Sequence, residues 1–237
     1  MMSILDGLMD DKNLALLRKL EKVHIIKIEV VNNTSEYRCC SRKSNSTIYV
    51  PKSDICADSF THELLHIYLR FKEIFVGANL KSSIRGVEGL SKIYSDGLLE
   101  HIGNCLDHLM MLPIYLELGC DRSKFIIDYH KNKCTNHELE KIKRNWKKRF
   151  TYNSKMIDFY LGKYFAIKAC PNLDFDYSDS LEGLSKIDKR LFLINEKLVN
   201  NWLQVDIDSQ NIEDGFRTIV RNYVYDMESW IKLKRIR

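Results

Sequence analysis

The sequence predicts a mostly helical α+β fold, in which a small N-terminal antiparallel sheet packs on one helix and a helical C-terminal half follows. Strand-like runs of β-branched residues occur before residue 51, and apolar residues recur at helical spacing through most of the remaining chain. Of the 237 residues, 45% are hydrophobic and 29% are charged. This composition is typical of a globular protein that buries a substantial core.

The sheet is predicted from three short segments. Residues 24–31 (HIIKIEVV) and 46–50 (STIYV) are rich in β-branched side chains, and residues 35–41 (SEYRCCS) alternate weakly. Pro51 ends the last segment, because proline cannot donate a hydrogen bond to a neighbouring strand. We therefore expect about three antiparallel strands.

Helices are predicted wherever apolar residues return every three or four positions. They are expected at residues 11–22, 55–73, 90–112, 136–149, 154–169, 181–204 and 212–234, with a possible division of the sixth near Ser185. Ser53 or Asp54 is placed to cap the second of these helices. Residues 77–89 contain glycine and polar side chains and are expected to form a loop, either a lid over a site or a plain connector.

The second predicted helix carries the motif His62-Glu63-Leu64-Leu65-His66. Residues four positions apart share one helix face, so the two imidazoles can bind one zinc ion. Glu63 lies about 100° further around the helix, where it can take a proton from a water on that ion. The motif lies in a strongly helical pattern after a predicted strand, and this context favours a metal site over two incidental histidines.

A catalytic zinc ion needs a third protein ligand, and the next long helix offers candidates. On a helical wheel His101, Cys105 and His108 lie near the buried stripe, whereas Glu100 and Asp107 point further toward solvent. His108 is our first choice of ligand, with His101 and Glu100 as the alternatives.

The segment from His24 to His66 resembles the core of the zincin metallopeptidases, in which strands precede a helix with a sequence such as THELLH. It is most similar to the small branch that includes the ImmA/IrrE-type bacterial proteases. The resemblance implies a zinc cofactor, His62 and His66 as ligands and Glu63 as the catalytic base. It also implies that an extended peptide substrate lies along residues 46–50 as an edge strand.

The resemblance stops short of two zincin subgroups and covers the first half of the chain. There is no HExxHxxGxxH, as metzincins have, and the downstream glutamate motif of thermolysin-like enzymes is missing; Glu100 to His108 (EHIGNCLDH) is the nearest equivalent. We expect a zincin-like core over residues 1–121 and a helical region over residues 122–237, as two domains or one continuous domain.

The sequence predicts a cytosolic protein without a membrane span, because no run approaches the roughly 20 consecutive apolar residues that cross a bilayer. The seven cysteines form no CxxC pair, and Asp6, Asp10 and Asp11 interrupt any export signal. The net charge of +5 is concentrated in residues 141–149 (KIKRNWKKR) and 232–237 (KLKRIR). These runs are typical of solvated surface, and contact with nucleic acid is the less favoured reading.

The sequence therefore predicts a cytosolic zinc metallopeptidase that hydrolyses a specific protein or peptide substrate. The alternatives are a zinc hydrolase of another substrate, since the fold does not fix the bond that is cleaved, and a non-catalytic zincin-like module that binds a protein or nucleic acid. Glu63 favours an enzyme, because a purely structural metal site has no use for a base.

Overall fold

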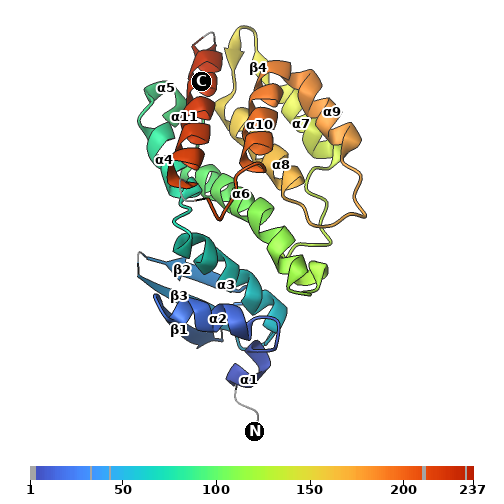
Figure 1. Cartoon of the computed structure of the whole chain (residues 1–237). Helices are drawn as coiled ribbons and strands as arrows, with labels where there is room; N and C mark the ends of the chain where they lie inside the picture. Colours follow the sequence, from blue (N-terminus) through green and yellow to red (C-terminus); the bar gives the residue numbers. More distant parts are fainter. Residues whose placement is uncertain (1–3, 33, 43, 210–211, 233) are drawn as a thin grey trace. The chain divides into compact units, whose positions relative to one another are not determined.

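The computed structural model describes residues 4–32, 34–42, 44–209, 212–232 and 234–237, and it confirms a mostly helical α+β fold (Figure 1). Helices make up 59% of the chain and strands 11%, so the sheets are a minor component. No helix in these ranges is both long and apolar enough to cross a membrane. The chain forms two compact units, Met1–Ile74 with Met110–His130, and Phe75–Leu109 with Lys131–Arg237.

The two units interleave along the chain. The predicted division into residues 1–121 and 122–237 assumed two consecutive stretches, whereas each compact unit takes two separate segments. The reason is the long helix α6 (Asp96–Glu117), whose first part belongs to the second unit and whose end belongs to the first.

The first unit contains a three-stranded mixed sheet in the order β1-β3-β2. Its strands are β1 (Ile25–Val31), β2 (Arg38–Ser41) and β3 (Asn45–Pro51). The prediction that the sheet is antiparallel was wrong for one pair, because β1 runs parallel to β3 while β2 runs antiparallel to it. The prediction that β3 is an edge strand was also wrong, since β3 is paired on both sides and has no free edge.

The first unit also contains three helices, α1 (Ile4–Leu8), α2 (Leu14–Glu21) and α3 (Ala57–Phe71). Helix α3 packs against β2 and β3, and α1 and α2 pack against α3. Ile48 and Val50 of β3 meet Phe60, Leu64 and Ile67 of α3 in a core where all five are fully buried. This alternation along β3 and the helical spacing along α3 follow from one buried face on each element.

Buried Asn13 joins α2 to α3 by polar contacts. Its side-chain amide lies 3.0 Å from the Thr61 hydroxyl and 2.9 Å from the Leu8 carbonyl oxygen, and Asn13 is fully buried. Because a buried amide that loses its partners is costly, this contact fixes α3 against the preceding segment.

The start of α3 differs from the predicted cap. Neither Ser53 nor Asp54 caps the helix, which begins after Cys56 and has no side-chain cap of its own. The Tyr37 hydroxyl accepts a hydrogen bond from the Cys56 N–H at 2.8 Å and donates one to the Asp54 carbonyl at 2.6 Å. Burial raises the pKa of Tyr37 to about 12, so this hydroxyl keeps its proton.

The prediction of a loop over residues 77–89, as a lid or as a plain connector, was wrong, because most of this segment is helical. It forms α4 (Val76–Arg85) and α5 (Glu88–Ser91). Val76, Leu80 and Ile84 recur every four residues and are fully buried, and this apolar stripe outweighs the local cost of glycine and serine. Gly77 allows a close helix contact, since a Cβ at Gly103 would lie 2.9 Å from the Gly77 Cα.

Helix α6 starts later and ends later than predicted. The Ser95 hydroxyl accepts a hydrogen bond from the Leu98 N–H at 3.1 Å and so defines the start at Asp96. Pro113 lies inside the helix rather than at its end. Met111 and Tyr115, on either side of the proline, are fully buried, and their packing keeps the helix intact despite one lost backbone hydrogen bond.

The remainder of the second unit is a group of helices with one small sheet. The helices are α7 (Asn136–Asn145), α8 (Ser154–Lys168), α9 (Ser178–Ile187), α10 (Lys189–Trp202) and α11 (Ile212–Ile231), and a 3-10 turn, η1 (Arg122–Lys124), belongs to the first unit. Asp188 divides α9 from α10 by accepting the Leu191 N–H at 3.0 Å, which confirms the expected division near Ser185. The sheet β4-β5-β6 consists of β4 (Lys147–Lys148), β5 (Thr151–Tyr152) and β6 (Arg235–Ile236), and it was not predicted.

Substitution of Gly103 tests the close contact between α4 and α6. Gly103→Ala should lower the free energy of unfolding by about 1–3 kcal/mol, because the new methyl group meets backbone that cannot move aside. Gly97→Ala on the same helix is the matched control, since its Cβ meets nothing within 4 Å. It should leave stability unchanged or raise it by up to about 1 kcal/mol. Urea denaturation measures both, and equal effects would contradict the contact.

Substitution of Tyr37 tests the substitute cap of α3. Tyr37→Phe removes the hydroxyl that satisfies the Cys56 N–H and should cost about 0.5–2 kcal/mol of stability. Tyr225→Phe serves as a control, because this side chain is 68% exposed. Denaturation curves that coincide for the Tyr37 variant and the parent protein would refute the capping role.

Candidate metal centre

His62 and His66 face the same way from α3. Their Nε2 atoms are 3.2 Å apart, and the two ring centroids are separated by 4.9 Å. Two nitrogens bound to one tetrahedral zinc ion at about 2.0–2.1 Å are roughly 3.3 Å apart, so this separation suits a shared ion. The one-turn spacing of the motif thus gives the geometry that the sequence predicts.

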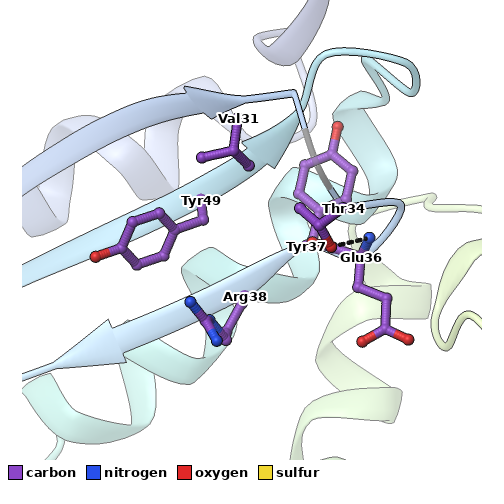
Figure 2. A pocket seen from close by; sticks show the side chains of 6 residues that line it. All are labelled: Val31, Thr34, Glu36, Tyr37, Arg38 and Tyr49. Carbon is purple, nitrogen blue, oxygen red and sulfur yellow. Dashed lines mark hydrogen bonds between the residues drawn. The ribbon is translucent and has the colours of Figure 1, made fainter.

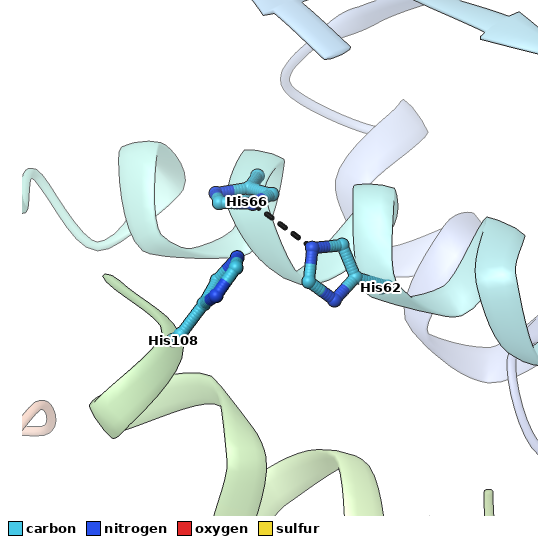
Figure 3. A group of neighbouring side chains, drawn as sticks. All are labelled: His62, His66 and His108. Carbon is cyan, nitrogen blue, oxygen red and sulfur yellow. Dashed lines mark hydrogen bonds between the residues drawn. The ribbon is translucent and has the colours of Figure 1, made fainter. Parts of the chain in front are cut away.

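The structure brings His108 of α6 to this pair. One ligand atom from each of His62, His66 and His108 lies within 4.8 Å of the others, and this group could hold a metal ion. Figure 3 shows the His108 ring reaching from α6 toward the two rings on α3. Three imidazoles are a donor set suited to zinc and to other divalent transition metals, so the residues fit the group that the sequence predicts.

The histidines of this group are less exposed to solvent than surface histidines usually are. His62 and His108 are 8% and 9% exposed, whereas His66 is half-buried. Imidazole rings packed together and away from water are costly unless each finds a polar partner or an ion.

The two alternative ligands have other roles. His101 is exposed, and its Nε2 lies 3.1 Å from the Gly162 carbonyl oxygen on α8. Glu100 is also exposed and forms an ion pair with Lys81 at 3.4 Å. Neither belongs to the three-histidine group.

Asp107 corrects one detail of the helical-wheel analysis. The wheel places this residue toward solvent, but Asp107 is only 2% exposed. A helical wheel represents a single helix, so it cannot show that other parts of the chain bury one of its residues.

Glu63 is buried on the neighbouring face of α3, with 6% of its surface exposed. Burial raises the pKa of its carboxyl group, and the charge of His66 and the backbone N–H of Cys39 partly offset this shift. The hydrogen bond from Cys39 fixes the carboxylate against strand β2. The Glu63 carboxylate is therefore fixed in position by Cys39, and it binds a proton more readily than an exposed glutamate does.

Sequence reasoning did not identify Phe125, whose ring packs edge-on against His62. The ring centroids are 4.7 Å apart with an interplanar angle of 71°, and Tyr115 packs on Phe125 in a similar way at 5.0 Å. Phe125 is 2% exposed, so it forms an apolar wall that restricts the His62 ring. No sequence motif surrounds Phe125, and only the fold brings it to this position.

A polar link holds the segment with Phe125 beside α3. Asp58, in the first turn of α3, accepts a hydrogen bond from Lys12 at 2.5 Å and from the Asp121 N–H at 2.9 Å. Burial opposes ionisation of Asp58, but these two partners outweigh burial and lower its pKa. A carboxylate in this position also suits the positive end of the helix dipole.

No family model, curated protein or solved structure matches this chain. Function must therefore be inferred from the arrangement of the side chains.

A pocket of about 270 Å³ lies elsewhere in the first unit, lined by Val31, Thr34, Glu36, Tyr37, Arg38 and Tyr49 (Figure 2). Tyr49 and Arg38 are cross-strand partners, with the guanidinium 5.1 Å from the ring centroid. Tyr49 alternates with Ile48 and Val50, which face α3, so its side chain lies on the opposite face of the sheet. This pocket is therefore not part of the site around His62.

Histidine substitution tests the three-histidine group. The parent protein should bind about one zinc ion per chain, and His62→Ala or His108→Ala should abolish or strongly weaken binding, because two imidazoles remain. His101→Ala removes a histidine of the same helix α6 that lies outside the group and should retain the metal. Elemental analysis after dialysis measures the metal content. Equal metal content in His108→Ala and His101→Ala would exclude His108 as a ligand.

Proposed function

We propose that this chain is a zinc-dependent hydrolase, and specifically a metallopeptidase that cleaves a protein or peptide substrate. The observation that carries the proposal is the combination of three convergent histidines with a buried carboxylate on the same helix turn. A structural metal site requires only the ligands. Hydrolysis requires in addition a general base, and Glu63 supplies a carboxylate directly after His62 and three residues before His66.

His62, His66 and His108 would hold the ion through neutral imidazoles. Three protein ligands leave one position of a tetrahedral ion open, which is the arrangement of catalytic rather than structural zinc. When bound, zinc supplies Lewis acidity that lowers the pKa of water toward about 7 and polarises a carbonyl group. Phe125 keeps the His62 ring in place and excludes water from one side of it.

Glu63 would act as the general base. Its carboxylate accepts a proton from the attacking water and returns that proton to the leaving amine. Burial supports this role, because it raises the pKa of the carboxyl group and so improves the carboxylate as a proton acceptor near neutral pH. The Cys39 N–H aims the carboxylate, so Glu63 loses little freedom in the reaction.

Strand β2 is the element along which an extended substrate would lie. It replaces β3 in this role, because β2 has a free edge and β3 does not. Cys39 of β2 also contacts Glu63, so a peptide paired with β2 would lie next to the base. This arrangement supports the resemblance to the zincin metallopeptidases without extending it to a particular substrate.

The Glu63→Gln variant tests the proposed reaction. It should retain zinc at the level of the parent protein and lower the rate of peptide hydrolysis about 10²- to 10⁴-fold, because an amide cannot accept the proton. Peptide-library cleavage followed by mass spectrometry measures the activity, with Glu100→Gln as the matched control on an exposed carboxylate. Removal of zinc by a chelator should abolish cleavage, and added zinc should restore it. Cleavage by Glu63→Gln at the parent rate would exclude Glu63 as the base.

A further inference from the structure

The fold brings the two basic runs of the sequence together in the sheet β4-β5-β6. The first run supplies β4, and the C-terminal run, of which Leu233 lies outside the described residues, supplies β6. Strand β5 lies between them, antiparallel to β4 and parallel to β6. Segments separated by most of the second unit's sequence thus form one surface.

The two faces of this sheet differ in character. Lys148, Thr151 and Arg235 are cross-strand partners, so their side chains share one face. Tyr152 lies on the other face, where it meets Trp146 with ring centroids 6.4 Å apart and where the Lys234 Nζ is 4.1 Å from its centroid. The face with Tyr152 is packed, which leaves the face with Lys148 and Arg235 to solvent.

The turn of the β4–β5 hairpin presents an aromatic side chain. Phe150 is 87% exposed, more than any other large hydrophobic residue in the described part of the chain. Arg149, beside it, has a φ of 56°, in the left-handed region that favours glycine. The turn therefore holds an exposed phenylalanine and a strained arginine where glycine and a polar residue would be more stable.

The cations of this surface remain available to a ligand. Several neighbouring cations are paired within the protein: Lys143 with Glu140, Lys232 with Glu228, and Lys234 with Asp188. Within the described ranges, no ion pair is found for the five exposed cations of the sheet and its ends. These are Lys147, Lys148, Arg149, Arg235 and Arg237.

We propose that this surface, made of Lys148, Arg149, Phe150, Thr151, Arg235 and Arg237 and named here the basic sheet, binds a single-stranded polynucleotide. The cations would contact successive phosphates, and a base would stack on the exposed Phe150 ring. This combination of backbone charge contacts and aromatic stacking is how sequence-tolerant single-strand surfaces bind.

A membrane surface fits the basic sheet less well. Cations would also attract anionic lipids, but stable membrane anchoring needs a larger apolar area or a second signal. The basic sheet offers one exposed apolar ring, which is sufficient to stack on one base. A double helix is a poorer fit as well, because its bases are already stacked on one another.

Fluorescence anisotropy with a labelled oligothymidylate of about 15 nucleotides tests the proposal. The full-length protein should bind at low salt. Phe150→Ala should weaken binding roughly 5- to 150-fold through the lost stacking. Replacing both Lys148 and Arg235 by Gln should reduce the slope of log affinity against log salt by about 1.4, which is about 0.7 for each lost phosphate contact.

Three control variants separate binding from folding and from general charge. Leu173→Ala removes another highly exposed apolar side chain, and Lys186→Gln removes a surface cation that pairs with Glu182; both should bind like the parent. Arg149→Gly removes a cation but relieves the left-handed backbone. Its affinity should fall while its melting temperature does not, and a misfolded variant cannot give this result.

Several outcomes would overturn the proposal. These are no anisotropy change at the lowest salt, equal affinity of Phe150→Ala and the parent protein, or an unchanged salt slope in the double variant. Phe150-dependent binding to phosphatidylserine vesicles without binding to the oligonucleotide would assign the surface to membranes instead. His62→Ala should bind the oligonucleotide normally, so this test is independent of the proposed hydrolase activity.

Discussion

The arrangement at the metal centre depends on α3 remaining a rigid helix. The Nε2 atoms of His62 and His66 lie 3.2 Å apart only while the three residues between them keep the helical conformation, which brings positions i and i+4 together. Phe60, Leu64 and Ile67 enforce this geometry, because their fully buried side chains on the opposite face fix the rotation of the helix against the sheet. The same rotation turns Glu63 toward strand β2, so burial of one face determines the position of both histidines and of the carboxylate.

The elements nearest this helix were the most predictable from the sequence. The strands predicted at residues 24–31 and 46–50 match β1 and β3 in their bounds to within one residue. The predicted helix with the motif matches α3 to within two residues. The strands are rich in β-branched residues, and the helix has apolar residues at helical spacing. The order and direction of the strands were not predictable, because a residue alternation shows which face is buried and not which strand lies next to it.

Errors arose where local composition and tertiary packing disagree. Glycine and serine near residues 77–89 suggested a loop, yet Val76, Leu80 and Ile84 pack into a helix and Gly77 makes the close approach possible. Residues 147–149 were predicted to end the helix that begins at residue 136, yet residues 147–152 form a hairpin that pairs with β6, from the other end of the second unit's sequence. A single sequence contains no direct signal for such pairings.

The residues of the candidate site also fall into two groups, those that the sequence predicted and those that it did not. His62, His66 and His108 follow from helix periodicity, because each lies beside an apolar stripe on a long helix. Phe125 and Cys39 do not, because they come from irregular or short segments that only the fold brings to α3. Periodicity therefore predicts residues that regular elements present, and it misses those that support them.

The indole of Trp202 has a consequence for the modular character of this protein. Its Nε1 donates a 2.8 Å hydrogen bond to the Leu106 carbonyl, across a sequence separation of 96 residues, and Trp202 is fully buried. Leu106 lies on the same turn region of α6 as His108. A fragment that contains all three histidines but ends before α10 lacks Trp202. The part of α6 around Leu106 would then be exposed to solvent. Helix α3 and His108 of α6 therefore do not form a self-sufficient fragment. A transfer of the three histidines into another protein would have to include α10 as well.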